Sequence, residues 1–77
     1  MNEQVLSRVR EIASDVLQAE VTPESSPETV ESWDSVQHLN LVVAIEEEYG
    51  FVFLPEEMEQ ATSVGSLARL VTAKRGA

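Results

Sequence analysis

The chain has 77 residues, enough for one small domain, and a chain of this size buries only about 60% of the surface that it exposes when unfolded. It contains no cysteine and one histidine, which excludes disulfide bonds, thiolate metal sites, cysteine nucleophiles and a multi-histidine metal cage. We therefore expect a single domain over residues 1–77, with no metal site and no deep active site.

The formal net charge is −9, and all the basic residues lie near the two ends of the sequence. Between Glu11 and Ala68 there is no lysine or arginine. A protein that binds nucleic acid needs a basic patch, so this distribution argues against nucleic acid as a partner. It also opposes binding to an anionic membrane, and no apolar run approaches the roughly 20 residues that insert across one. The acidity either keeps a small protein soluble or steers it toward partners with basic docking faces.

The first predicted element is an amphipathic helix from about Asn2 or Glu3 to about Leu17. Its charged and polar residues face water, and its apolar residues form one broad stripe for packing, which consists of Val5, Leu6, Val9, Ile12, Ala13, Val16 and Leu17.

A long connection follows, roughly residues 19–33, with two prolines, several glutamates and little periodicity. Connections of this length are uncommon in compact domains. We expect an ordered crossover, because a disordered linker would leave the first helix too little to pack against. Val21 and Val30 are the aliphatic residues expected to reach the core.

The second helix is predicted over residues 35–49. Asp34 is expected to be its N-cap, since the carboxylate can accept from free backbone N–H groups of the first turn, and Gly50 is placed to end the helix. The predicted buried face, with Glu46 at its edge, consists of Leu39, Val42, Ile45 and Tyr49.

Two further valines of the second helix, Val36 and Val43, do not fit that face. They lie with Asn40 and Glu47 on a separate ridge. The ridge indicates either a small apolar contact surface or an apolar arc that is simply wide, and the pattern alone does not decide between them.

Beyond the second helix, residues 51–54 are compatible with a strand or a buried loop. Pro55 and the two glutamates after it predict a short third helix that ends near Ala61. Thr62 or Ser63 is expected to cap a last helix, from about residue 64 to residue 73. Its predicted inward residues are Val64, Leu67, Leu70 and Val71, and the residues that suit its end are Lys74, Arg75 and Gly76. The predicted fold is therefore all-α, a small four-helix bundle with a long loop between helices 1 and 2.

Ser35 is the candidate functional residue, because it stands at the start of the second helix, where outward-pointing N–H groups favour a phosphate. Three explanations are open: a hydrolytic nucleophile, a plain helix-start serine, or the acceptor of a phosphate-containing group. His38 lies one turn along, but the sequence offers no third catalytic member and no pocket-forming motif, so we do not expect an enzyme. We expect His38 to be a solvent-facing or boundary residue; a contact with phosphate would raise its pKa.

The motif Asp34-Ser35-Val36, the helix after it and the run Ala-Ile-Glu-Glu-Glu-Tyr-Gly at residues 44–50 resemble the acyl carrier proteins and the related peptidyl carrier domains. The resemblance covers most of the chain. It includes the length, the acidic balance, the long first loop and two further segments, Leu54-Pro55-Glu56-Glu57 and Thr62-Ser63-Val64.

This resemblance implies that a separate Mg²⁺-dependent transferase attaches 4′-phosphopantetheine from coenzyme A to Ser35, with Asp34 as the helix cap of the motif. The thiol of the arm would then carry an acyl, polyketide or aminoacyl unit as a thioester, which suits a carrier without cysteine. The implied partners are the 4′-phosphopantetheinyl transferase, a loading ligase and downstream synthase or transferase enzymes with basic docking faces. The alternative is an unmodified acidic helical adaptor in protein–protein interactions.

The resemblance also implies that partners contact the second helix, at Val36, Asn40, Val43, Glu46, Glu47 and Glu48. Val36 stands where the motif usually has leucine, and Gln37 and Asn40 replace residues that are acidic in typical fatty-acid carriers. Ser32 and Trp33 replace the more familiar Gly-x before the aspartate. These departures favour a dedicated carrier in a specialised biosynthetic pathway over one in fatty acid biosynthesis. We expect a cytoplasmic monomer without catalytic activity.

Overall fold

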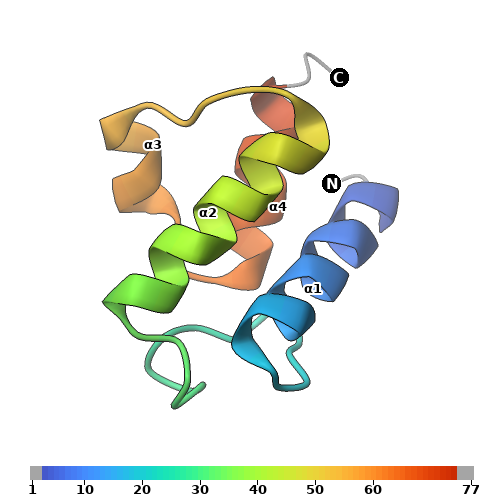
Figure 1. Ribbon diagram of the computed structural model, residues 1–77. Helices are drawn as coiled ribbons and strands as arrows, with labels where there is room; N and C mark the ends of the chain where they lie inside the picture. The colour runs from blue at the N-terminus through green and yellow to red at the C-terminus, as the bar shows by residue number, and fades with distance from the viewer. Residues whose placement is uncertain (1–2, 75–77) are drawn as a thin grey trace.

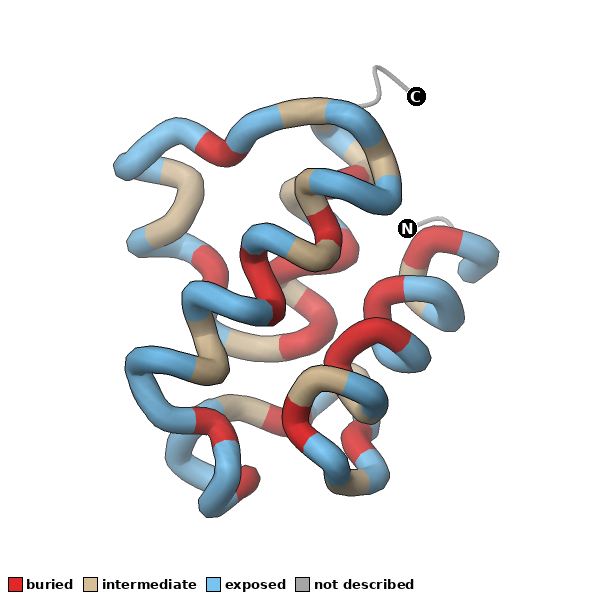
Figure 2. Tube along the Cα trace, viewed as in Figure 1, coloured by how far each residue is buried: buried red, intermediate tan, exposed pale blue. Residues whose placement is uncertain are grey.

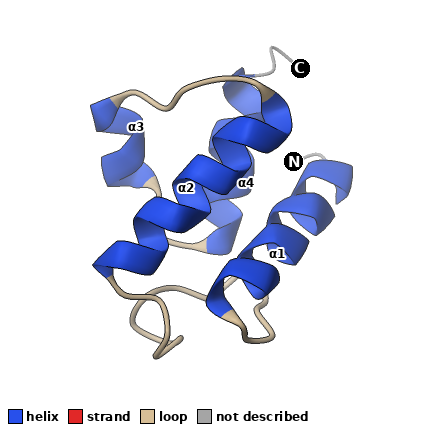
Figure 3. Ribbon diagram, in the orientation of Figure 1, coloured by secondary structure: helices blue, strands red, loops and turns tan. Residues whose placement is uncertain are grey.

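The computed structural model describes residues 3–74, which form four α-helices and contain no β-strand (Figure 1; Figure 3). The helices are α1 (Glu3–Leu17), α2 (Ser35–Tyr49), α3 (Pro55–Gln60) and α4 (Val64–Lys74). α1 packs against both α2 and α4, and α3 packs against α4. The prediction of a small helical bundle with a long first loop and a short third helix is therefore confirmed. The expected roles of Arg75 and Gly76 lie outside the described residues.

The core lies where α1, α2 and α4 meet, and the buried positions along the chain turn toward that centre (Figure 2). On α1 the predicted stripe is correct: Leu6 and Val16 are half-buried at its margin, and the fully buried members are Val5, Val9, Ile12, Ala13 and Leu17. On α4 the predicted Leu70 is half-buried, and the buried residues are Val64, Gly65, Leu67, Ala68 and Val71.

α2 departs from its predicted orientation. It buries Leu41, Val42 and Ile45, whereas the side chain of Leu39 is 55% exposed. The prediction that Leu39 faces the core is wrong, and Leu41 takes that place. The reason is that apolar residues point in nearly every direction around this helix, so spacing alone does not define its inner face. Packing against α1 decides which of them are buried.

The long loop between α1 and α2 is an ordered crossover that contributes to the core. Val21 and Val30 are buried as predicted, and Trp33 is buried as well, with only 2% of its surface exposed. The loop also satisfies backbone groups at the start of α4, because Val64 N donates to Ser25 O at 3.0 Å. These anchors fix the chain just before α2 begins.

A second contact between this loop and α4 is a close approach of the backbone at Gly65. Gly65 N donates to Pro23 O at 2.9 Å, and a Cβ atom at residue 65 would lie only 3.1 Å from the same oxygen. That is closer than ordinary van der Waals contact, so a larger residue would push the loop away from α4.

Residues 51–54 form a loop that brings Phe53 into the core.

The Glu57 carboxylate accepts from Leu54 N at 2.7 Å and from Lys74 Nζ at 2.8 Å, so it joins the start of α3 to the end of α4. The bond from Leu54, followed by that from Lys74, lowers the pKa of Glu57. At the start of α4 the capping residue is Ser63, whose Oγ accepts from Ser66 N at 3.1 Å.

Candidate functional site

The start of α2 is fixed by Asp34, whose extended backbone, with φ −96° and ψ −174°, is typical of an N-cap. Its Oδ1 accepts from Gln37 N at 2.9 Å, and its carbonyl oxygen accepts from His38 N at 2.8 Å. The Asp34 carboxylate is therefore engaged with the backbone of the first turn.

Ser35 is the first residue of α2 and is exposed. Within residues 3–74, the backbone N–H groups of Ser35 and Val36 have no hydrogen-bond partner, as is usual for the first turn of a helix. Free N–H groups and the positive end of the helix dipole attract an anion. The Ser35 hydroxyl thus stands where a phosphate group attached to it would be stabilised.

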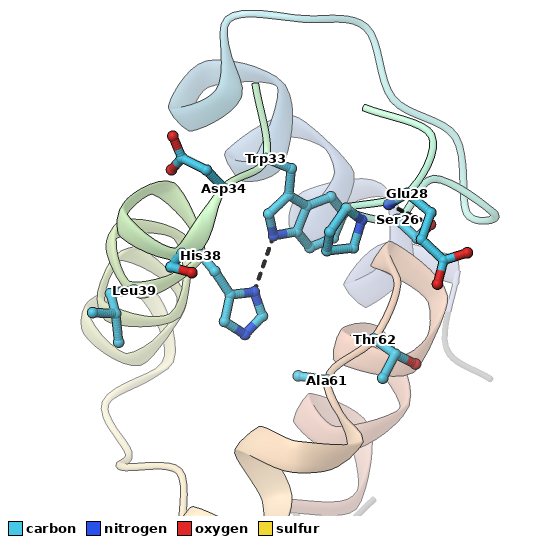
Figure 4. Close-up of a pocket in the computed structure, with 10 residues that line it drawn as sticks. Ser26, Glu28, Trp33, Asp34, His38, Leu39, Ala61 and Thr62 are labelled. Atoms are coloured by element: carbon cyan, nitrogen blue, oxygen red, sulfur yellow. Dashed lines mark hydrogen bonds between the residues drawn. The ribbon is translucent and has the colours of Figure 1, made fainter. Parts of the chain in front are cut away.

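A groove of about 690 Å³ opens beside Ser35, between the first turn of α2, the long loop and the connection from α3 to α4 (Figure 4). Its walls are mainly apolar. The lining side chains come from three separate segments of the chain and are those of Ser26, Pro27, Glu28, Trp33, Asp34, Ser35, His38, Leu39, Ala61 and Thr62.

Trp33 and His38 interact on one wall of this groove. Trp33 Nε1 donates to His38 Nδ1 at 3.0 Å, and the two rings are stacked with their centroids 6.0 Å apart. Burial lowers the pKa of His38, and the bond from Trp33 acts in the same direction because it requires an unprotonated Nδ1. The bond from Trp33 Nε1 to Nδ1 is thus one that the neutral ring makes. A raised pKa would require contact with an attached phosphate, so that expectation stays a prediction for the holo protein.

The geometry does not assemble a catalytic serine. His38 Nδ1 is already bonded to Trp33, and in the described part of the chain no hydrogen bond joins His38 to Ser35. Among residues 3–74 no group of three histidine, cysteine, aspartate or glutamate side chains is placed to hold a metal ion.

None of the helices formed by these residues is long and apolar enough to cross a membrane.

The outward face of α2 carries large apolar side chains. Val36 is 67% exposed and Val43 is 49% exposed, so the two valines do not belong to a wide buried arc. Leu39 extends this face, because it lies three residues after Val36 and four before Val43. Asn40 and Glu47 are exposed on the same face. Hereafter "the outward face" means Val36, Leu39, Asn40, Val43 and Glu47.

The other two glutamates of the predicted partner surface make contacts within the chain. Glu46 Oε2 accepts from Phe53 N at 2.7 Å and so holds the loop after α2. Glu48 Oε1 pairs with Arg8 Nη2 at 2.8 Å, across the contact between α1 and α2. The hydrogen bond from Arg8 lowers the pKa of Glu48.

Sequence reasoning missed two features of the site. The exposure of Leu39 was missed because its spacing fits both the predicted buried face and the ridge of Val36 and Val43. The bond between Trp33 and His38 had a weaker signal, namely that a buried tryptophan usually finds an acceptor for its N–H group.

Comparison with known proteins agrees with this arrangement. Residues 7–71 match the family model for the phosphopantetheine attachment site. The acyl carrier protein of Picosynechococcus sp. is 30% identical over 80 residues, which cover 100% of this chain and 99% of that protein. The acyl carrier protein of Rubrobacter xylanophilus is 35% identical over 65 residues, which cover 80% of each chain.

The fold is similar to the solution structure of holo acyl carrier protein from Geobacter metallireducens, with a TM-score of 0.83 and 32% identity, over 94% of this chain and 86% of that one. The family model thus spans most of the sequence, and relatives match over most of their length. The chain belongs to the acyl carrier protein family: it is a carrier, not an enzyme, and it carries acyl groups on a covalently attached 4′-phosphopantetheine.

Proposed function

We propose that Ser35 is the residue that bears the 4′-phosphopantetheine and that α2 presents the loaded arm to partner enzymes. The observation that carries this proposal is the exposed Ser35 hydroxyl at the start of α2, beside the unpaired backbone N–H groups of Ser35 and Val36. When bound, the group supplies a flexible arm whose thiol holds the acyl unit as a thioester. The protein's own part is to stabilise the phosphate and to orient the arm.

Asp34 supports this role indirectly. Its carboxylate is bonded to Gln37 N, so it stabilises the first turn instead of competing for the free N–H groups. The groove lies directly beside Ser35 and gives the arm a surface to rest on.

The experiment is intact-mass measurement after incubation with coenzyme A, Mg²⁺ and a promiscuous phosphopantetheinyl transferase. We expect the wild-type chain to gain the mass of one phosphopantetheine and Ser35→Ala to gain none. Ser26→Ala is the matched control, because Ser26 lines the same groove. It should be modified like the wild type. If the folded wild-type chain gained no mass, the proposal would be contradicted.

Proteins of this family interact with a phosphopantetheinyl transferase and with synthase enzymes. We propose that such partners bind the outward face. Val36, Leu39 and Val43 would make the apolar contact, and Glu47 would attract basic groups of the partner. Asn40 lies between these residues. Glu46 and Glu48 add to the negative field, but their carboxylates already accept hydrogen bonds within the chain.

Charge reversal at Glu47 tests this surface. Glu47→Lys should slow modification and loading by about threefold at low salt, because it weakens steering toward basic partners, and the deficit should shrink as salt is added. Glu3→Lys on α1 makes the same change of net charge at another exposed residue and is the control. Equal rates for both variants would count against a partner surface on α2.

We further propose that the carrier acts in the cytoplasm, as a monomer, in a specialised pathway with its own loading ligase. The support is that residues 35–45 of α2 contain no acidic side chain, unlike the typical fatty-acid carrier that the chain resembles. If enzymes of fatty acid synthesis used this holo protein as efficiently as their own carrier, the specialised role would be contradicted.

A further inference from the structure

His38 has one ring nitrogen that is free to bind a group in the groove, and the bond to Trp33 determines that this nitrogen is a donor. Trp33 Nε1 can only donate, so the hydrogen bond between the rings requires His38 Nδ1 to be the acceptor. In the neutral ring the proton then resides on Nε2. Figure 4 shows the His38 ring between Trp33 and Ala61, with Nε2 on the side away from Trp33. Among the described residues, Trp33 is the only hydrogen-bond partner of this ring.

The groove is continuous with the start of α2. Ser35 and His38 both line it and lie one helical turn apart, so a group attached to Ser35 enters the groove at its edge and meets His38 next. Leu39 and Ala61 add apolar lining from α2 and from the connection between α3 and α4, and Thr62 adds a hydroxyl group. This combination suits a chain that alternates apolar stretches with carbonyl groups, as the amides of pantetheine do.

We propose that His38 is a positioning residue for the pantetheine arm: its Nε2–H donates to an amide carbonyl oxygen of the arm lying in the groove, while Trp33 fixes the ring. This inference rests on the proposed attachment at Ser35. His38 touches no reacting atom in this arrangement; it limits the positions that the arm adopts when no partner is bound.

The charges around the groove agree with a neutral occupant. Asp34 and Glu28 are among the residues that line it, and the negative charge of their carboxylates repels an anion. In the proposed arrangement the free N–H groups at the start of α2 would hold the phosphate, and the uncharged part of the arm would lie in the groove. Burial lowers the pKa of His38, so the ring meets a neutral carbonyl as a neutral donor.

The experiment is NMR of holo protein carrying ¹⁵N-labelled histidine and an arm labelled with ¹³C at its amide carbonyls. We expect Nε2 to bear the proton in both apo and holo forms, and the Nε2–H resonance to move downfield and exchange more slowly with water in the holo form. Cross-peaks between the His38 ring and the arm should appear as well. Intact mass is measured first, so that failed attachment, which contradicts the proposed function, is told apart from failed docking.

Two substitutions separate the two nitrogens of His38. In His38→Asn the shorter amide can still accept from Trp33 but cannot reach the arm. The fraction of holo molecules whose arm lies in the groove (the docked population) should therefore fall about fivefold, which is the effect of losing one net hydrogen bond. His38→Gln places an N–H group near the position of Nε2 and should retain most of the docking. Spectra of the apo variants show whether each one folds.

Thr62→Val is the control, since it removes another polar group of the same groove without a change of shape. It should leave the docked population unchanged. Loss of docking in Thr62→Val but not in His38→Asn would assign the contact to Thr62 and overturn the proposal. So would a His38 pKa that rises on attachment, because it would place the ring against the phosphate.

Discussion

α1 and α2 are both 15 residues long and pack against each other, yet they distribute their apolar side chains differently. α1 buries five residues along one face and none of its large apolar side chains is fully exposed. α2 buries only three, and it exposes the large apolar side chains of Val36, Leu39 and Val43.

The difference fits a role in packing alone for α1 and the proposed partner-binding role for α2. The apolar residues of α1 match what the core requires, so its sequence is explained by stability. α2 has more apolar residues than the core contacts, and the gathering of exposed apolar side chains on one face supports the contact surface that we propose there. The helix with this surplus is also the one that begins at Ser35.

The largest expected effect separates the inner and outer leucines of α2. Leu41→Ala should lower the free energy of unfolding by about 2 to 5 kcal/mol, because it leaves a cavity at a fully buried position. Leu39→Ala should change it by less than about 0.5 kcal/mol. Denaturant titration of both variants measures the two values. If Leu39→Ala lowered the free energy of unfolding as much as Leu41→Ala, the assignment of Leu39 to the exposed face would be contradicted.

The same pair of leucines shows how far the sequence determines the fold. The ends of α2 carry local signals, since Asp34 supplies a side-chain cap and Gly50 adopts the left-handed φ of 73° that favours glycine. Both ends were therefore predictable. The inner face was not, because it depends on where α1 lies, and the spacing of Leu39 and Leu41 is compatible with either rotation.

The candidate site shows a similar division. Ser35 could be proposed from the sequence, because the motif and the helix start are contiguous. The contact of Trp33 with His38 depends on how the long loop returns to α2, and the partner of Glu48 is Arg8, forty residues earlier. The pair of Arg8 and Glu48 is non-local, so no local pattern indicates it. Trp33 and His38 are only five residues apart, but their bond depends on the burial of Trp33 by the loop, which the sequence signals only weakly.

A second, smaller effect concerns the end of α2. Glu46→Ala should lower the free energy of unfolding by about 1 to 2 kcal/mol, because it removes the carboxylate that accepts from Phe53 N. Glu46→Gln keeps an oxygen acceptor for Phe53 N, so it should lower the free energy of unfolding by less. Glu47→Ala, next in sequence but exposed, should stay within about 0.5 kcal/mol of the wild type. If the two alanine variants unfold alike, Glu46 does not anchor the loop and belongs with the partner-facing charges.

The smallest expected effect lies between the two helices, at the pair of Arg8 and Glu48. The hydrogen bond from Arg8 lowers the pKa of Glu48 relative to the unfolded chain. The unfolded state therefore binds a proton at higher pH than the folded state does. The pair stabilises the fold above the ordinary glutamate pKa of about 4.3, and this contribution disappears as the pH falls through the lowered value.

Glu48→Gln removes that dependence, so wild type and variant should differ slightly at pH 7 and converge in acid. Both partners are more than one-third exposed, so the difference is small and weakens further in high salt. Thermal unfolding across pH measures it, and Glu11→Gln is the control, because Glu11 pairs with the same Arg8 within α1. A Glu48 variant that is destabilised equally at all pH values would show that this side chain joins α1 to α2 by packing and not by its charge.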